Sequence, residues 1–212
     1  MPLAPHAHSD PQAVYEALQY EVTQLHDYWK LYRDLYTDPD HVGVLSEAAA
    51  GAFGSLQEVL AQSIVIGIGR LLDRERNGKQ ENLTLHRLPE LLRAVGCPEL
   101  VTDVETQLAA LREHSKAIVA RRHKRAGHSD LGVALGAIVL DPVTWPLIDR
   151  AAQMIRELMV SVEAPIRGRD VSMDYEGIVL IGDGHDLVRT LRMAEAHREC
   201  LRAKSGLPPR SD

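Results

Sequence analysis

The chain has 212 residues, enough for one domain, or one and a half, with a substantial buried core. Hydrophobic residues make up 45% of it and charged residues 25%, as in an ordinary soluble globular protein. The formal net charge of −6 excludes a surface that is basic all over, so any contact with nucleic acid has to lie on a local basic patch.

The first third of the chain predicts two long helices. Residues 9–11 (Ser-Asp-Pro) offer a capping side chain and then a proline at the first helical position. Apolar residues follow every three or four positions as far as Tyr36, which predicts one amphipathic helix. Residues 37–39 (Thr-Asp-Pro) end it and begin a second helix, predicted over about 39–73. Its glycines at 51, 54, 67 and 69 weaken or kink it, since each costs up to about 1 kcal/mol relative to alanine.

The middle of the chain predicts a charged loop over 74–81, a short helix over about 84–95, and a third long helix opened by Pro98. Gly127 stops or distorts that third helix. One face of it carries a stripe that we expect to point inward. The residues of this stripe are Val101, Val104, Leu108, Leu111, Ser115 and Ile118.

Residues 131–140 are apolar and contain glycine, a pattern that fits either a loop or a short extended piece. A helix after Asp141-Pro142 is predicted to end at Pro165, followed by a loop over 166–184 and a last helix over about 185–204. The pattern predicts an all-α fold, an up-and-down helical bundle of four to five main helices. We expect one domain over 11–204 between flexible tails, 1–10 and 205–212.

The two cysteines, Cys97 and Cys200, are far apart and lack metal-ligand spacing, which favours a reducing compartment over a disulfide framework. The first ten residues lack the apolar core of a signal peptide. The most apolar run, 63–72, is too short to span a bilayer. We therefore expect a cytoplasmic protein with no membrane contact.

The densest functional signal is the basic run over residues 120–130, ARRHKRAGHSD. Cations at a helix C-terminus are favoured by the helix dipole, by about 0.3–1 kcal/mol each, and that alone accounts for part of the pattern. However, the inward stripe, continued four residues beyond Ile118, reaches Arg122, which should line a crevice and need an anionic partner. His128 follows a glycine and can turn back toward Arg122. An imidazole beside guanidinium groups suits phosphodiester chemistry.

Two carboxylates near this run have alternative interpretations. Asp73, at the end of the second helix, either orients Arg122 or His128 or pairs on the surface with Arg70 or Arg74. Asp130 either supports the site or caps the segment that follows it. His, Asp and Glu residues show no persuasive metal spacing, so we expect neither a metal nor another cofactor.

Residues 122–128, RHKRAGH, resemble the Arg-(polar)-x(3–5)-His motif of HEPN domains. The wider run RRHKRAGHSD is similar to the R-N-K-x-x-A-H-S-D form of the abortive-infection type U branch, with His123 and Gly127 in place of the more usual Asn and Ala. The segments LHDYWKLYRDLYT, GRLLDRE and ENLTLHRL, in that order upstream, also resemble this branch. The resemblance covers roughly residues 12–190.

This resemblance implies a helical bundle that forms a homodimer, with two motifs facing each other across a composite cleft. It also implies a metal-independent endoribonuclease, of the kind found among toxins and antiphage effectors and controlled by an antitoxin or another regulator protein. Arg122 and His128 would be the catalytic pair, with His128 as general acid or base, and His123 would hold the polar place after the arginine.

On the same resemblance, Arg121, His123, Lys124 and Arg125 would bind RNA phosphates, with Asp73 and Asp130 in support. The alternative is a non-catalytic HEPN module that binds RNA, a nucleotide or a partner protein through the same cleft. A third interpretation is a purely structural helical dimer, in which Arg122 pairs with an internal carboxylate such as Asp73.

Overall fold

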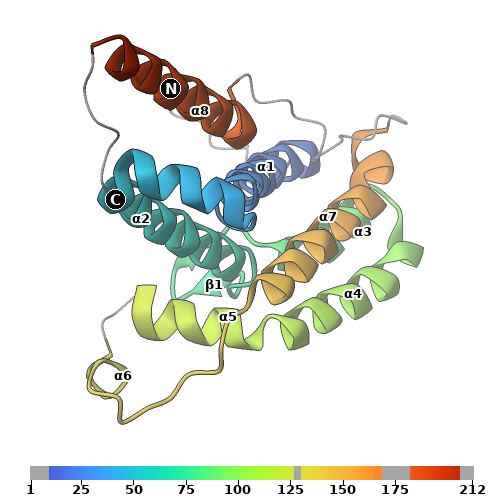
Figure 1. The fold of residues 1–212 in the computed structure, drawn as a ribbon. Helices are drawn as coiled ribbons and strands as arrows, with labels where there is room; N and C mark the ends of the chain where they lie inside the picture. The colour runs from blue at the N-terminus through green and yellow to red at the C-terminus, as the bar shows by residue number, and fades with distance from the viewer. Residues whose placement is uncertain (1–9, 127–129, 169–181, 206–212) are drawn as a thin grey trace. The chain divides into compact units, whose positions relative to one another are not determined.

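The computed structural model describes residues 10–126, 130–168 and 182–205 (Figure 1). These residues are mainly helical, with almost no sheet, so the predicted all-α class is confirmed. The chain divides into two compact units: unit 1 is formed by 1–27 and 62–177, and unit 2 by 28–61 and 178–212. The predicted tails lie almost wholly outside the described residues, and the boundaries of one domain over 11–204 stay a prediction.

The first two helices form where the sequence predicts them. Helix α1 spans Pro11–Tyr36, and its stripe at Leu18, Val22 and Leu25 is buried. Helix α2 spans Pro39–Leu71 but leaves helical geometry at Ala49 (φ −166°, ψ 74°). This kink lies two residues before Gly51, the first of the glycines predicted to weaken or kink the helix.

Helix α2 is also long and apolar enough to cross a membrane, judged by length and composition alone. An 18-residue window of it has a mean hydropathy of 1.3, and 22% of that window is buried. One helix of this kind is weak evidence, because core helices of soluble proteins pass the same test. The described residues therefore carry no clear signal of a membrane protein, and the cytoplasmic location stays a prediction.

In unit 1, helix α4 (Val101–His114) packs along helix α7 (Trp145–Arg167), with helix α3 (Leu88–Ala94) against both (Figure 1). All six residues of the predicted inward stripe are buried. The predicted single helix is interrupted at the buried Ser115 (φ −91°, ψ 7°), after which α5 spans Lys116–Arg121. Backbone hydrogen bonds from Ser115 N and to Ser115 O keep the usual four-residue spacing, so α4 and α5 continue in nearly one line.

The predicted loop over 74–81 contains a small antiparallel hairpin. Strand β1 (Arg76–Asn77) pairs with β2 (Gln80–Glu81), Arg76 opposite Glu81. Gly78 makes the tight turn possible because its φ of 63° lies in the left-handed region. All four strand residues are polar and exposed. The sequence therefore has no alternating apolar pattern that would predict the hairpin.

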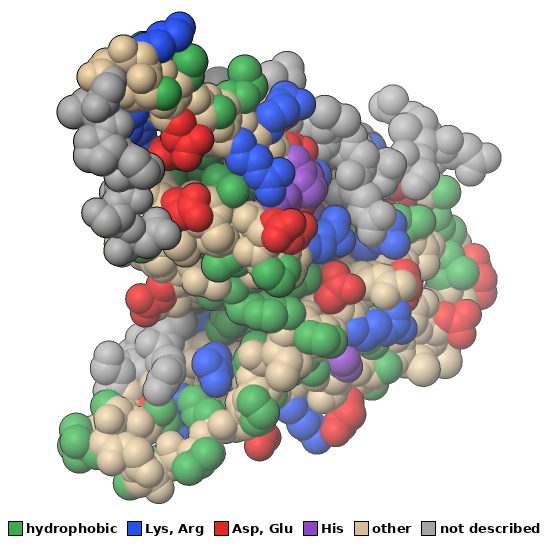
Figure 2. Space-filling model, in the orientation of Figure 1, with side chains coloured by type: hydrophobic (Ala, Val, Ile, Leu, Met, Phe, Trp, Pro, Cys, Tyr) green, Lys and Arg blue, Asp and Glu red, His purple; other side chains and the backbone are tan. Residues whose placement is uncertain are grey.

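The segment 131–140 begins as a helix, whereas its sequence fits either a loop or a short extended piece. Leu131–Ala134 make the one-turn helix α6. Apolar side chains gather over this helix and the segment after it (Figure 2), where Leu131, Leu135, Ile138 and Val139 are exposed. Val133 is the only buried hydrophobic residue of the segment, so local polar contacts hold it more than a core does.

The prediction that Pro165 ends its helix is wrong. Helix α7 continues to Arg167 and stops at Gly168, whose φ of 64° forms a left-handed cap with its N–H bonded to Ala164 O at 2.9 Å. A proline in the last turn removes one backbone donor, and here the helix tolerates that loss close to its end.

Helix α7 is fastened to α1 by polar contacts as well as by the core of unit 1. Tyr15 donates its hydroxyl hydrogen to Met159 O at 3.1 Å, in a buried position. The guanidinium of Arg167 lies 5.8 Å from the centre of the Tyr15 ring and donates to Gln19 Oε1 at 2.9 Å. The same guanidinium contacts the buried Glu163 at 3.4 Å, which offsets the cost of burying that charge.

In unit 2, helix α8 (Gly184–Lys204) packs its Val188 against Leu35 and Leu45. Asp183 caps the helix by accepting from Asp186 N. Lys30 reaches both Asp34 (2.7 Å) and Asp183 (3.1 Å) and ties the start of α8 to α1.

The close approach of α8 to α1 requires a glycine at position 184. A Cβ at Gly184 would lie 2.6 Å from Asp34 Cβ and 3.2 Å from two carbons of Leu35. We expect Gly184→Ala to lower the free energy of unfolding by about 1–3 kcal/mol through this overlap. Urea denaturation of the purified protein measures it.

Gly54→Ala is the matched control, because a Cβ at Gly54 in α2 would meet nothing within 4 Å. That substitution should stabilise the protein by up to about 1 kcal/mol through helix propensity. Equal effects of the two substitutions would contradict the close approach at Gly184.

Candidate functional site

Arg122 directly follows α5, and its side chain lies across helix α2. A Cβ at Gly69 would stand 2.9 Å from Arg122 Cγ, 3.0 Å from Cδ and 3.2 Å from Cβ. The aliphatic part of the arginine therefore occupies the space that a larger residue at 69 would need. The sequence assigned Gly69 only a weakening effect on its helix, and its packing role depends on a contact between distant segments.

The charged end of Arg122 is held by Asp73. Arg122 Nη1 donates to Asp73 Oδ1 at 2.7 Å, and the two side chains are 21% and 27% exposed. Of the alternatives for Asp73, the structure therefore has the carboxylate bound to Arg122; Arg70 pairs with Glu21 at 3.3 Å instead. Nε and Nη2 of Arg122 have no acceptor among the described residues, so the guanidinium keeps donors for a further anion.

The segment after Arg122 is held by contacts between Lys124 and Asp130. Residues Arg122–Ala126 form a wide π-helical turn, a geometry often found at functional sites. Lys124 Nζ lies 2.5 Å from Asp130 Oδ2, and Asp130 N donates to Lys124 O at 3.1 Å. Lys124 and the backbone N–H of Val133 hold the pKa of the Asp130 carboxyl below its usual range. Asp130 is thus the cap of α6 as well as the partner of Lys124.

The other predicted site residues are placed as follows. Arg121 is half-buried, and its Nε is buried without an acceptor among the described residues. His123 is exposed. His128 and the side chain of Arg125 lie outside the described residues, so the predicted pairing of Arg122 with His128 stays a prediction.

A pocket of about 530 Å³ opens beside the motif, with His123 at one end. It is lined by Leu72, Ala109, Arg112, Glu113, Lys116, Val119, Ala120 and His123. Lys116 is paired with Glu113 at 2.6 Å, whereas Arg112 has no acidic partner among the residues that the structure describes. Both precede the basic run in the sequence, but the sequence does not show that they share a cavity.

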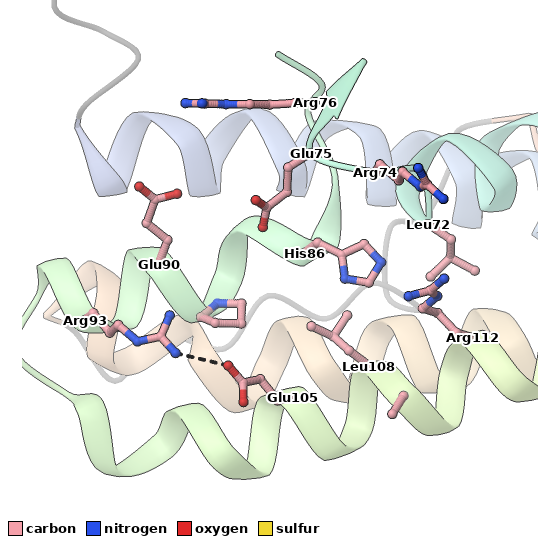
Figure 3. Close-up of a pocket in the computed structure, with 12 residues that line it drawn as sticks. Leu72, Arg74, Glu75, Arg76, His86, Glu90, Arg93, Glu105, Leu108 and Arg112 are labelled. Carbon is pink, nitrogen blue, oxygen red and sulfur yellow. Dashed lines mark hydrogen bonds and ion pairs between the residues drawn. The ribbon is translucent and has the colours of Figure 1, made fainter. Parts of the chain in front are cut away.

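A second pocket, of about 730 Å³, adjoins the first and shares Leu72, Ala109 and Arg112 with it. Figure 3 shows Arg74 and Arg112 reaching from different segments toward the end where Leu72 lies, with the His86 ring beside them. Farther along, Arg93 and Glu105 close the pocket with an ion pair of 3.0 Å. Sequence reasoning missed this pocket, because segments 72–76, 86–93 and 105–112 meet only through tertiary packing.

His86 is the titratable group at the centre of the second pocket. Burial lowers the pKa of its imidazole from the ordinary 6.5, and the nearby Arg112 charge lowers it further. Glu75 and a backbone hydrogen bond to Leu72 act in the opposite direction without reversing the shift. His86 is therefore mainly neutral near pH 7. In the described residues, no three His, Cys, Asp or Glu side chains are grouped so that they could hold a metal ion.

The Arg122–Asp73 pair should contribute to stability, because each group is shielded and its partner compensates its charge. We expect Asp73→Asn to lower the free energy of unfolding by about 1–3 kcal/mol, since the guanidinium then lacks a charged acceptor. Glu157→Gln is the control, because Glu157 forms an exposed pair with Arg150 and should matter by less than about 1 kcal/mol. Chemical denaturation that finds the two variants equal would contradict a structural role for the Arg122–Asp73 pair.

The lowered pKa of His86 predicts a pH dependence of stability. The unfolded chain takes up a proton at His86 near pH 6.5 and the folded protein only at lower pH, so acidification through this range favours unfolding. We expect the free energy of unfolding to fall from pH 7.5 to 5.5, and to fall less in His86→Gln. His197→Gln, at an exposed position of α8, should follow the wild type, and measured curves that coincide for all three proteins would refute the effect.

Comparison with known proteins relates the chain to a family. A family model described as AbiU2, of the HEPN type, matches residues 11–176, a stretch that contains Gly69, Asp73 and the whole basic run. No curated protein and no solved structure matches the chain significantly.

Proposed function

This chain belongs to the AbiU2 family of HEPN domains, and on that premise we propose that it is a metal-independent endoribonuclease of the HEPN type. The family membership confirms the resemblance predicted from the sequence. It also associates the chain with abortive infection, so we propose an antiphage or toxin role for the nuclease.

The observation that carries this proposal is the way Arg122 is held. Its stem lies against Gly69, one guanidinium nitrogen is bound to Asp73, and its remaining donors are unused among the described residues. An arginine fixed by packing and by a carboxylate is preorganised to stabilise charge that develops on a phosphate. Asp73 thus acts as a positioning residue for Arg122.

The proposed reaction cleaves RNA by internal attack. His128 removes the proton of a ribose 2′-hydroxyl, and the 2′ oxygen attacks the adjacent phosphorus. Arg122 donates to the phosphate oxygens as their negative charge increases. The bond to the 5′ oxygen then breaks, and that oxygen takes its proton from the imidazolium. The products are a 2′,3′-cyclic phosphate and a 5′-hydroxyl, with no oxidant, metal or cofactor consumed.

We further propose that two copies bring their motifs together in a composite cleft, where Arg121, His123, Lys124 and Arg125 contact flanking phosphates. The Lys124–Asp130 pair is only half-buried, so a phosphate can reach Lys124. In this arrangement Lys124 gives up part of its contact with Asp130 to bind that phosphate. An antitoxin or regulator protein would control access to the cleft.

The decisive experiment incubates wild-type and His128→Ala protein with a mixed RNA pool in the presence of EDTA. We expect the wild type alone to cleave, leaving 2′,3′-cyclic phosphate ends, with at least about a hundredfold loss in the variant because proton transfer is removed. His197→Ala is the matched control, since this histidine is exposed on α8. Cleavage that survives both His128→Ala and Arg122→Ala would refute the proposal.

A second candidate is a non-catalytic HEPN module that binds RNA, a nucleotide or a partner protein. The observation in its favour is that two of the motif's cations already have carboxylate partners, Arg122 with Asp73 and Lys124 with Asp130. A binding module needs the basic surface but no proton-transferring histidine. Full binding by His128→Asn, together with no cleavage by the wild type, would favour this candidate.

A further inference from the structure

The two pockets next to the motif are continuous along one side of unit 1. They share Leu72, Ala109 and Arg112, and together they lead from His123 past α5 and α4 to Arg93. We call the two together the α4 groove. Its lining includes His123, the residue after Arg122 in the sequence.

Charge is distributed unevenly along the α4 groove. Three of its basic side chains form ion pairs: Lys116 with Glu113, Arg76 with Glu81, and Arg93 with Glu105. Arg74 and Arg112, in contrast, have no acidic partner among the described residues, and both reach toward the junction of the two pockets (Figure 3).

Two carboxylates, Glu75 and Glu90, also line the second pocket, and Figure 3 shows them on the wall away from Arg112. The junction is therefore the place in the α4 groove where two uncompensated guanidinium groups favour an anion.

The shape of the groove suits nucleotide units rather than an isolated ion. Its two parts measure about 530 and 730 Å³, a size that holds organic ligands rather than a few waters. Leu72, Leu108 and Pro89 give it an apolar wall, and His86 adds a flat ring that is mainly neutral. Apolar and planar surfaces beside arginines are the usual partners of unstacked bases.

We propose that the α4 groove binds a single strand of RNA beside the cleavage site, with one phosphate at the junction between Arg74 and Arg112 and its base against Leu72 and His86. This inference rests on the proposed ribonuclease function and extends it by naming where the substrate strand runs. A duplex fits less well, because its closely spaced phosphates call for a broad basic surface and the chain has a net charge of −6. A mononucleotide would fill only one of the two parts.

The test measures binding of a fluorescein-labelled 12-nucleotide RNA by anisotropy at several salt concentrations. The His128→Ala variant of the 212-residue chain serves as the background, and gels verify that the RNA stays intact. We expect Arg112→Ala and Arg74→Ala each to weaken binding by about tenfold and to reduce the salt slope by about 0.7, the value for one lost single-strand phosphate contact. Arg112→Lys should retain most of the affinity, and the melting temperature of each variant shows that it is folded.

Arg150→Ala is the matched control, because Arg150 is an exposed arginine of unit 1 that lines neither pocket. Unchanged affinity and salt slope in the two groove variants would overturn the inference, and so would an equal loss in Arg150→Ala. AMP that competes as tightly as the 12-mer would also overturn it, in favour of a nucleotide site.

Parallel cleavage assays separate this inference from the proposed function. Wild-type cleavage with an unchanged KM in Arg112→Ala and Arg74→Ala would refute the α4 groove and leave the ribonuclease intact. RNA binding that depends on both arginines, without any cleavage by the wild type, would support the groove and refute the ribonuclease.

Discussion

The Arg122–Asp73 ion pair is the interaction on which the rest of the candidate site depends. Asp73 follows the end of α2 and Arg122 follows α5, so the pair joins two segments 49 residues apart at the point where the basic run begins. It can form only because Gly69 leaves room for the arginine stem. Helix packing sets the position of the guanidinium, and the carboxylate then fixes its orientation.

The periodic parts of this molecule could be predicted from the sequence, and so could the residue that matters most in the site. The inward stripe of α4 and α5 is buried throughout, and its extension by one step located Arg122 at a partly buried position. Helix periodicity carries this information because it is local. The partner of Asp73 could not be selected, since Arg70, Arg74, Arg122 and His128 were all plausible until α2 and α5 were placed together.

The errors have local energetic causes that a pattern of residue types does not weigh. Pro165 looked like a helix end, but a single missing donor near the terminus is tolerated when Gly168 supplies a left-handed cap three residues later. The break at Ser115 was hidden because the residue keeps the stripe's spacing. The α4 groove was missed for a different reason: three segments distant in sequence build its walls.

The ion pair and the backbone hydrogen bond between Lys124 and Asp130 have a consequence for conformational entropy. A backbone hydrogen bond and an ion pair hold residues 124 and 130 together, so the ends of the intervening segment are brought together when the protein folds. A ligand that contacts Lys124 therefore meets a residue whose position relative to residue 130 is already set. Preorganisation of this kind raises affinity without adding a contact, because less freedom is lost in the complex.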